Sequence, residues 1–131
     1  MDNEAIVKKW FEFAEMDFQT AQYLYAHMIP QPREIICYHC QQAIEKALKG
    51  LLIAYGKGIK KTHDLGLLAE MLQDYCEVSE EYIDLCDNLT PYGVRVRYPQ
   101  DMEMEDYHVK EALHNAEKIF LWSKQVLEKM K

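Results

Sequence analysis

One stretch decides the fold: residues 33–55, which read Arg33-Glu-Ile-Ile-Cys-Tyr-His-Cys-Gln-Gln-Ala-Ile-Glu-Lys-Ala-Leu-Lys-Gly-Leu-Leu-Ile-Ala-Tyr55. The apolar residues recur at steps of three and four, which is the period of an α-helix, and they form two adjacent stripes. The first stripe contains Ile36, Cys40, Ala43, Ala47, Leu51 and Ala54, and the second contains Cys37, Ile44, Leu48, Leu52 and Tyr55. A helix with so wide an apolar face needs neighbours on more than one side. We therefore predict that it is the central helix of the fold.

The remaining side of this helix is a narrow polar strip. It contains His39, Gln42, Glu45, Lys46 and Lys49. Glu45 precedes Lys49 by four residues, which is the favourable orientation for an ion pair within a helix. The strip is expected either to face water or to line a site.

Length and composition predict one all-α domain. A chain of 131 residues fits a single domain, residues 1–131, and is long enough to bury a core. Five glycines and four prolines leave few turns, and only Val94-Arg-Val-Arg-Tyr98 alternates β-branched residues. We expect an antiparallel up-and-down bundle of four to five helices.

Helical spacing and helix-breaking residues predict where the helices lie. The expected ranges are 3–28, 33–55, 65–76, 79–89 and 103–130. Pro30 and Pro32 end the first helix, because proline lacks the backbone N–H and restricts the residue before it. The expected capping residues are Gly56, either Thr62 or Asp64, and Ser79. Residues 90–102 carry two prolines and a glycine, so we expect a loop or a short extended segment there.

The first and last helices each carry one apolar face. The first is expected to bury Ile6, Trp10, Phe13, Ala14, Phe18, Ala21, Leu24, Tyr25 and Met28. The last is expected to bury Val109, Ala112, Leu113, Ala116, Ile119, Phe120, Ser123, Val126, Leu127 and Met130. Faces of this kind are typical of helices that pack on one side, so both helices should cover the central one.

Charge and hydropathy limit the function and the location. The net charge is -7, with 22 acidic and 15 basic residues. This charge argues against electrostatic binding of nucleic acid by the protein surface as a whole, so any nucleotide contact must be local. The acidic N-terminus lacks the apolar core of a signal peptide, and no apolar run approaches about 18 residues. We expect a soluble cytoplasmic protein without a membrane segment.

The four cysteines, Cys37, Cys40, Cys76 and Cys86, are expected to be free thiols. Cys37 and Cys40 have the spacing of a metal or redox pair, but they lie in the middle of a helix, within its apolar stripes, and lack the glycine-rich knuckle of a zinc site. Packing in the core is the better interpretation. We expect neither a metal nor a cofactor.

Three segments together resemble a HEPN domain: residues 38–52 of the central helix, Lys61-Thr-His-Asp-Leu65, and Arg97-Tyr-Pro99. The resemblance spans essentially the whole chain. It implies a bundle of four or five mainly antiparallel helices that usually forms a homodimer. Many bacterial members act with a minimal nucleotidyltransferase (MNT) as a toxin and antitoxin pair. Others are metal-independent ribonucleases, or noncatalytic modules thought to bind nucleotides or RNA.

The ribonucleases of this family carry an Arg followed a few residues later by a His, and this chain departs from that pattern. No His stands in register after Arg95 or Arg97, and His108 comes eleven residues after Arg97. Such an enzyme needs a group that moves a proton near neutral pH and a cation that stabilises the developing charge. We therefore assign no catalytic residue; the candidates for a rearranged site are Arg97, His63 and His108.

The clearest candidates for nucleotide or RNA binding lie in the loop before the last helix. Arg95 and Arg97 would contact a phosphate, and Tyr98 or Tyr92 would stack on a base. The alternative is that the arginines form ion pairs that tie the loop to the acidic surface.

Two further groups are weaker candidates. Lys60, Lys61 and His63 precede a helix N-terminus, where free N–H groups favour anions; capping with a solvated charge run is the favoured interpretation. Spacing within the central helix places a second group on one face, consisting of His39, Gln42 and Lys46. Its members would bind the ligand, or would satisfy buried groups at a helix contact or dimer seam.

The resemblance and the candidate residues together predict a homodimeric HEPN-family protein. It is expected to bind a nucleotide or RNA and to act with an MNT-type nucleotidyltransferase in a toxin–antitoxin-like pair. The alternatives are a metal-independent endoribonuclease and a noncatalytic structural partner subunit.

Overall fold

The helix expected at the centre of the fold is α2, Arg33–Ala54, and it contacts α1, α3, α4, α5 and α6. The computed structural model describes residues 3–94 and 104–131, and all regular secondary structure within them is helical. The other elements are α1 at Asn3–His27, α3 at Leu65–Leu72, α4 at Glu80–Leu89, the single turn α5 at Pro91–Val94, and α6 at Asp106–Lys129. The predictions of an all-α fold and of a central helix at residues 33–55 are confirmed.

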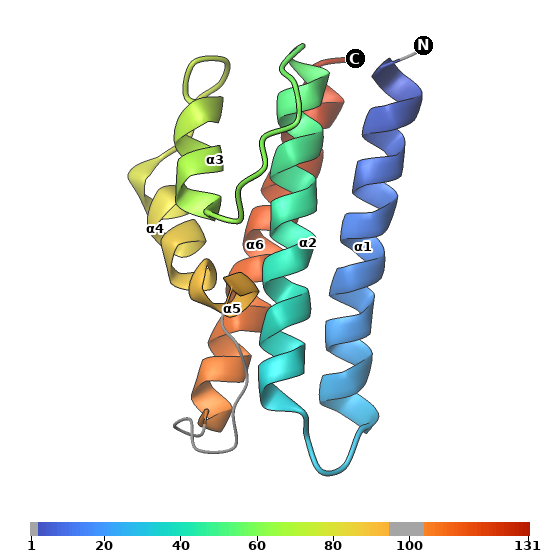
Figure 1. Ribbon diagram of the computed structural model, residues 1–131, viewed down its shortest axis with the longest axis vertical. Helices are drawn as coiled ribbons and strands as arrows, with labels where there is room; N and C mark the ends of the chain where they lie inside the picture. Colours follow the sequence, from blue (N-terminus) through green and yellow to red (C-terminus); the bar gives the residue numbers. More distant parts are fainter. Residues whose placement is uncertain (1–2, 95–103) are drawn as a thin grey trace.

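The helices form a bundle in which neighbours along the chain are not always antiparallel (Figure 1). The pairs α1–α2 and α3–α4 are antiparallel, as expected. Residues 55–64, however, run back along α2, so that α3 points in the same direction as α2, and α6 shares that direction. A connection of this length can return along its own helix, whereas a tight turn would have reversed the chain.

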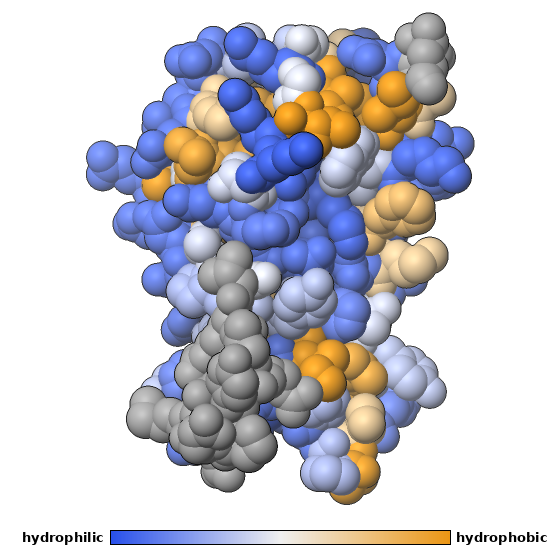
Figure 2. Space-filling view, viewed as in Figure 1, coloured by the Kyte–Doolittle hydropathy of each residue, from blue (hydrophilic) through white to orange (hydrophobic). Residues whose placement is uncertain are grey.

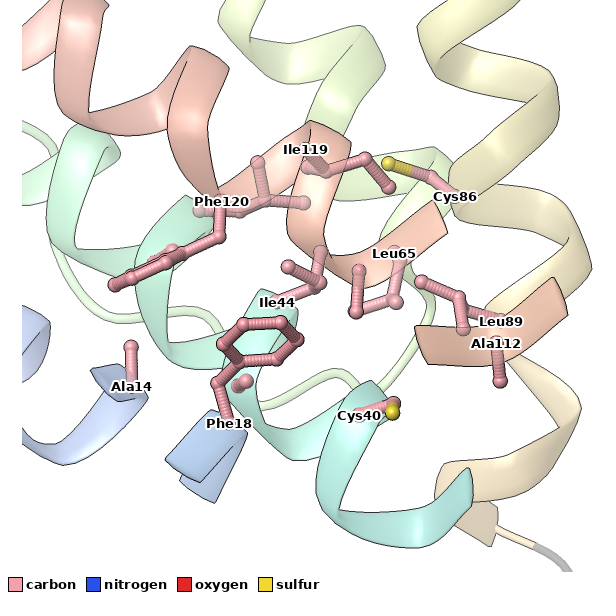
Figure 3. Packing of buried hydrophobic residues seen from close by; sticks show 14 of the residues in the cluster. Ala14, Phe18, Cys40, Ile44, Leu65, Cys86, Leu89, Ala112, Ile119 and Phe120 are labelled. Atoms are coloured by element: carbon pink, nitrogen blue, oxygen red, sulfur yellow. The ribbon is translucent and has the colours of Figure 1, made fainter. Parts of the chain in front are cut away.

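Side chains from five helices fill the core. Both apolar stripes of α2 are buried, including Ile36, Cys37, Cys40, Ile44, Leu48 and Leu51. Figure 3 shows Phe18 of α1, Leu65 of α3, Leu89 of α4 and Ile119 of α6 converging around Ile44. The burial of this face explains why α2 needs neighbours on several sides.

The cysteines belong to the core or its edge. All four are free thiols, and Cys37, Cys40 and Cys86 are buried. Burial raises the pKa of Cys37 to about 12 and that of Cys86 to about 12, with a smaller contribution from nearby carboxylates. The buried thiols therefore stay protonated at neutral pH and fit the interpretation of core packing.

The predicted helix caps are present. Gly56 has a φ of 88°, a left-handed conformation that suits glycine, and it follows the end of α2. Asp64 accepts a hydrogen bond at 3.1 Å from the N–H of Leu67, and Ser79 accepts one at 3.3 Å from the N–H of Tyr82. The starts of α3 and α4 are thus fixed by side chains that could be read from the sequence.

Some expectations for helix ends and faces are wrong. In the first helix Phe13 is 48% exposed and Val7 is buried, whereas Met28, which is 49% exposed, lies beyond the end of α1 at His27. Because α1 packs mainly on α2, its apolar face is wider than the contact that covers it. The helix expected at 65–76 ends at Leu72, and the last helix begins at Asp106 rather than at residue 103.

None of the helices in residues 3–94 and 104–131 combines the length and hydropathy that crossing a membrane requires.

Candidate functional site

Polar side chains follow the side of α2 that the core does not use, and they form what we call the polar band. Its members are Asp17, His39, Gln41, Gln42, Glu45, Lys46, Lys49 and His63. Figure 2 shows hydrophilic side chains gathered over the middle of the face that α2 presents. Two carboxylates, Glu45 and Asp17, organise the band.

Glu45 is the more buried of the two carboxylates, with only 6% of its surface exposed. It accepts hydrogen bonds from Lys49 Nζ at 2.9 Å, from Gln41 Nε2 at 3.1 Å and from His63 Nδ1 at 2.8 Å. Burial raises the pKa of Glu45, but the hydrogen bonds from His63, Lys49 and Gln41 and the charge of Lys49 outweigh that effect and lower it overall. The carboxylate is therefore ionised at neutral pH.

Gln41 is fully buried and connects this carboxylate to two other segments. Its Nε2 also donates to the backbone carbonyl of His63 at 3.1 Å, and its Oε1 accepts from Gln42 Nε2 at 2.9 Å. A Cβ atom placed on Gly93 would lie 2.2 Å from Gln41 Cδ, so only glycine lets α5 approach so closely. The network thus joins α2, the connection before α3, and α5.

Asp17 of α1 is the second carboxylate. It accepts a hydrogen bond from His39 Nδ1 at 2.9 Å, and it forms an ion pair with Lys46 Nζ. Its side chain is 14% exposed, so water screens these contacts only in part. Both contacts connect α1 to the polar side of α2.

The two carboxylates hold their histidines in the same way. An ionised carboxylate can only accept, so Nδ1 of His39 and Nδ1 of His63 each carry a proton. In the neutral imidazole the other nitrogen, Nε2, is then a proton acceptor, and in the imidazolium it is a donor. The side chain of His63 is 57% exposed and that of His39 is 26% exposed, so both are open to solvent. Each imidazole therefore has one ring nitrogen, Nε2, that its carboxylate does not use.

Comparison with known proteins identifies the family. The family model of the HEPN domain matches residues 7–126. The chain belongs to the HEPN family. The crystal structure of TT1696 from Thermus thermophilus is similar to this HEPN chain, with a TM-score of 0.77 and 27% identity over 91% of this chain and 96% of TT1696. ST0689, described as an archaeal HEPN homologue, has a TM-score of 0.70 and 25% identity over 91% of this chain and 95% of its own. No curated protein matches the chain.

The residues of this HEPN chain that were predicted to bind a ligand do not all come together. His39, Gln42 and Lys46 lie in the polar band, and His63 joins them through Glu45. Lys60 and Lys61 are exposed on the connection between α2 and α3. Arg95, Arg97 and Tyr98 lie outside the described residues, so their roles stay predictions.

The N-terminus of α3 is already occupied by side chains. The N–H of Leu65 donates to Thr90 Oγ1 at 3.0 Å, and the N–H of Leu67 donates to Asp64 Oδ1. Asp87 adds a carboxylate there, because a Cβ atom on Gly66 would lie 1.9 Å from its Oδ1. Capping therefore accounts for this turn, and two carboxylates beside it disfavour a phosphate.

His108, a candidate catalytic residue, has a structural task at the start of α6. Its Nδ1 accepts a hydrogen bond at 3.0 Å from the N–H of Glu105, and the two residues form a capping box. Among the described residues, no group of three or more His, Cys, Asp or Glu side chains is arranged to hold a metal ion.

Three residues of the site were not predicted from the sequence: Asp17, Gln41 and Gly93. Gln41 precedes Glu45 by four residues, so the rule that paired Glu45 with Lys49 could have found it. Asp17 and Gly93 carry no such signal, because their contacts join segments far apart in the chain.

Proposed function

We propose that this HEPN-family protein binds a nucleotide or RNA at the polar band. The observation that carries the proposal is the pair of histidines, His39 and His63, each held through Nδ1 by a buried or half-buried carboxylate. An imidazole fixed in this way presents Nε2 to a ligand without first having to be ordered. Lys46, which pairs with Asp17 and has a 28% exposed side chain, adds a cation that suits a phosphate.

The local nature of the site predicts modest salt dependence. The protein carries a net charge of -7, so the attraction comes from a few groups and is opposed by the rest of the surface. A single-stranded ligand loses about 0.7 logarithmic units of affinity per logarithmic unit of salt for each phosphate neutralised. Contact with about two phosphates gives a slope of about -1 to -2.

Fluorescence anisotropy with a labelled short single-stranded RNA tests the proposal. The double variant His39→Gln with Lys46→Gln should weaken binding at least about tenfold, since each charge-assisted contact is worth roughly 1.5–3 kcal/mol. The matched control is Lys124→Gln, an exposed lysine of α6 outside the band. Unchanged affinity in the double variant, with an unchanged melting temperature, would overturn the proposal.

The loop residues are tested separately. If the loop contributes to the site as the sequence predicts, the double variant Arg95→Ala with Arg97→Ala should bind the same RNA more weakly. Its affinity should also depend less steeply on salt concentration. Tyr98→Leu should weaken the binding of RNA more than the binding of inorganic phosphate, because the substitution removes only stacking on a base.

A metal-independent endoribonuclease is the second candidate, and one observation favours it. The contact between His63 Nδ1 and Glu45 resembles the carboxylate–imidazole pair of a general base, with Nε2 left to take a proton from a ribose hydroxyl. Arg97 would stabilise the charge on phosphorus. RNA cleavage in EDTA that is abolished by His63→Ala or Arg97→Ala, but not by the exposed control His114→Ala, would establish the enzyme.

The protein partner is also part of the proposal. Membership of the HEPN family supports an MNT-type nucleotidyltransferase as partner in a toxin–antitoxin-like pair, and four free cysteines are compatible with a cytoplasmic protein. Co-expression with a nucleotidyltransferase encoded next to this gene should yield a stable complex and relieve growth arrest. A complex without growth arrest would instead support a structural partner subunit.

A further inference from the structure

A pocket lies away from the polar band, where the C-terminal ends of α2 and α6 meet the turn before α4. Its volume is about 410 Å³, and its lining includes Tyr55, Glu77, Tyr82, Trp122 and Lys129. The ends of α2 and α6 lie at the same end of the bundle (Figure 1). The pocket belongs to neither of the surfaces that the HEPN motifs mark.

Aromatic rings form two walls of the pocket. Tyr82 stacks on Trp122, with ring centres 5.3 Å apart and an angle of 27° between the planes. Tyr55 stacks on Tyr75, with ring centres 5.1 Å apart and an angle of 18°. Because each ring is supported by a second one, the walls are preorganised and offer aromatic surface to a third ring.

The pocket is lined by one acidic and one basic side chain that are not used elsewhere. Glu77 and Lys129 are exposed, and neither forms an ion pair with any residue in the part of the chain that the structure describes. Tyr55 and Met130 are the C-terminal capping residues of α2 and α6 and both line the pocket, so the negative ends of two helix dipoles lie beside it. Carboxylate and dipoles favour an ammonium group, while Lys129 favours a carboxylate.

We propose that this pocket binds an aromatic α-amino acid. The side chain of the ligand stacks between the walls formed by Tyr55 and Trp122, its ammonium group pairs with Glu77, and its carboxylate pairs with Lys129. Opposite charges on one small molecule match the opposite charges of the lining, and the net charge of the ligand is zero. A phosphate dianion fits less well, because a single lysine would face it beside Glu77 and two helix C-termini.

Fluorescence of Trp122 tests the proposal. The chain has two tryptophans, so Trp10→Phe leaves Trp122 as the only one, and L-phenylalanine is a probe without indole emission. The emission should change with saturation in the millimolar to high-micromolar range. Phenethylamine lacks the carboxylate and 3-phenylpropionate lacks the ammonium group, so each should bind about two- to fivefold more weakly.

Two variants, each replacing one charged side chain by a neutral amide, show which charged group of the ligand pairs with which residue. Glu77→Gln should weaken binding of L-phenylalanine and phenethylamine but not of 3-phenylpropionate. Lys129→Gln should weaken binding of L-phenylalanine and 3-phenylpropionate but not of phenethylamine. The matched controls are Glu70→Gln on α3 and Lys124→Gln on α6, both exposed and outside the pocket. Calorimetry repeats the titration without relying on emission.

Three results would overturn the proposal. They are the absence of saturable binding by both methods, equal binding of all three probes that neither variant changes, and tighter binding of guanosine monophosphate than of L-phenylalanine. None of these measurements depends on RNA binding at the polar band, so the two proposals fail independently.

Discussion

Glu45 and His63 share one hydrogen bond but contribute differently to stability, because their burial differs. Glu45 is 6% exposed and pairs with Lys49, whose side chain is also nearly covered. Glu45→Ala leaves that ammonium group buried without a partner and should cost about 3 kcal/mol or more. His63→Ala removes an exposed partner and should cost at most about 1 kcal/mol. Urea unfolding of both variants measures the difference, and equal losses would contradict it.

The lowered pKa of Glu45 also predicts how stability depends on pH. Burial opposes ionisation, but hydrogen bonds from His63, Lys49 and Gln41 lower the pKa in the folded state below the ordinary value of 4.5. The carboxylate therefore stabilises the fold above pH 4.5, and this contribution is lost as pH falls through the folded pKa.

Glu45→Gln provides the measurement. The difference in free energy of unfolding between wild type and Glu45→Gln should be largest near neutral pH and should shrink in acid. Glu70→Gln, an exposed carboxylate of α3, should show no comparable trend. A difference that is constant from neutral pH to about pH 3 would show that the charge of Glu45 is not what stabilises the network.

At the scale of single residues, contacts within a helix could be predicted from the sequence, whereas contacts between helices could not. Spacing placed His39, Gln42 and Lys46 on one face and paired Glu45 with Lys49, because helix geometry fixes those relations. It could not find Asp17, since the alignment of α1 against α2 depends on packing along both helices. The path of residues 55–64, which brings His63 to Glu45, is likewise set by tertiary contacts.

Among the elements, α5 depends most on one small residue. Gly93 faces Gln41, and an added Cβ atom would lie 2.2 Å from Cδ and 2.4 Å from Oε1 of that side chain. Gln41 has no room to withdraw, because it is fully buried and bonded to Glu45 and to the carbonyl of His63. Gly93→Ala should therefore destabilise the fold by about 1–3 kcal/mol, the usual range for overpacking.

Gly58→Ala is the matched control, because a Cβ atom on Gly58 meets nothing within 4 Å. Thermal unfolding should show a clear loss for Gly93→Ala and little change for Gly58→Ala. If both variants have the melting temperature of the wild type, α5 can shift at little energetic cost and does not constrain the hydrogen bonds of Gln41.

Helix starts with a capping side chain were easier to predict than helix faces. The start of α4 could be read from Ser79, because a capping side chain acts on a backbone N–H only three residues away. Which face of a helix is buried depends on which other helices pack against it. Phe13 has the spacing of a core residue, yet it is 48% exposed because no described helix covers that side of α1.

For the whole molecule, the exposed side of α1 is the clearest sign of a further contact. Phe13, Met16 and Tyr23 are 48%, 62% and 65% exposed, and steps of three and seven residues place them on one side of the helix. Apolar groups gathered on one surface usually mark a site of association. We expect a second copy of the chain to cover this side, which agrees with the homodimer predicted from the sequence.

Light scattering tests the dimer. At tens of micromolar, the wild type should have twice the 15.5 kDa mass of one chain. Met16→Glu with Tyr23→Glu should yield a folded monomer, because both side chains are exposed and their replacement leaves the core intact. The matched control is Leu121→Glu, which places the same charge at a 52% exposed leucine of α6. A monomeric wild type, or a dimer that Leu121→Glu dissociates while the α1 variant does not, would show that this side of α1 is not the interface.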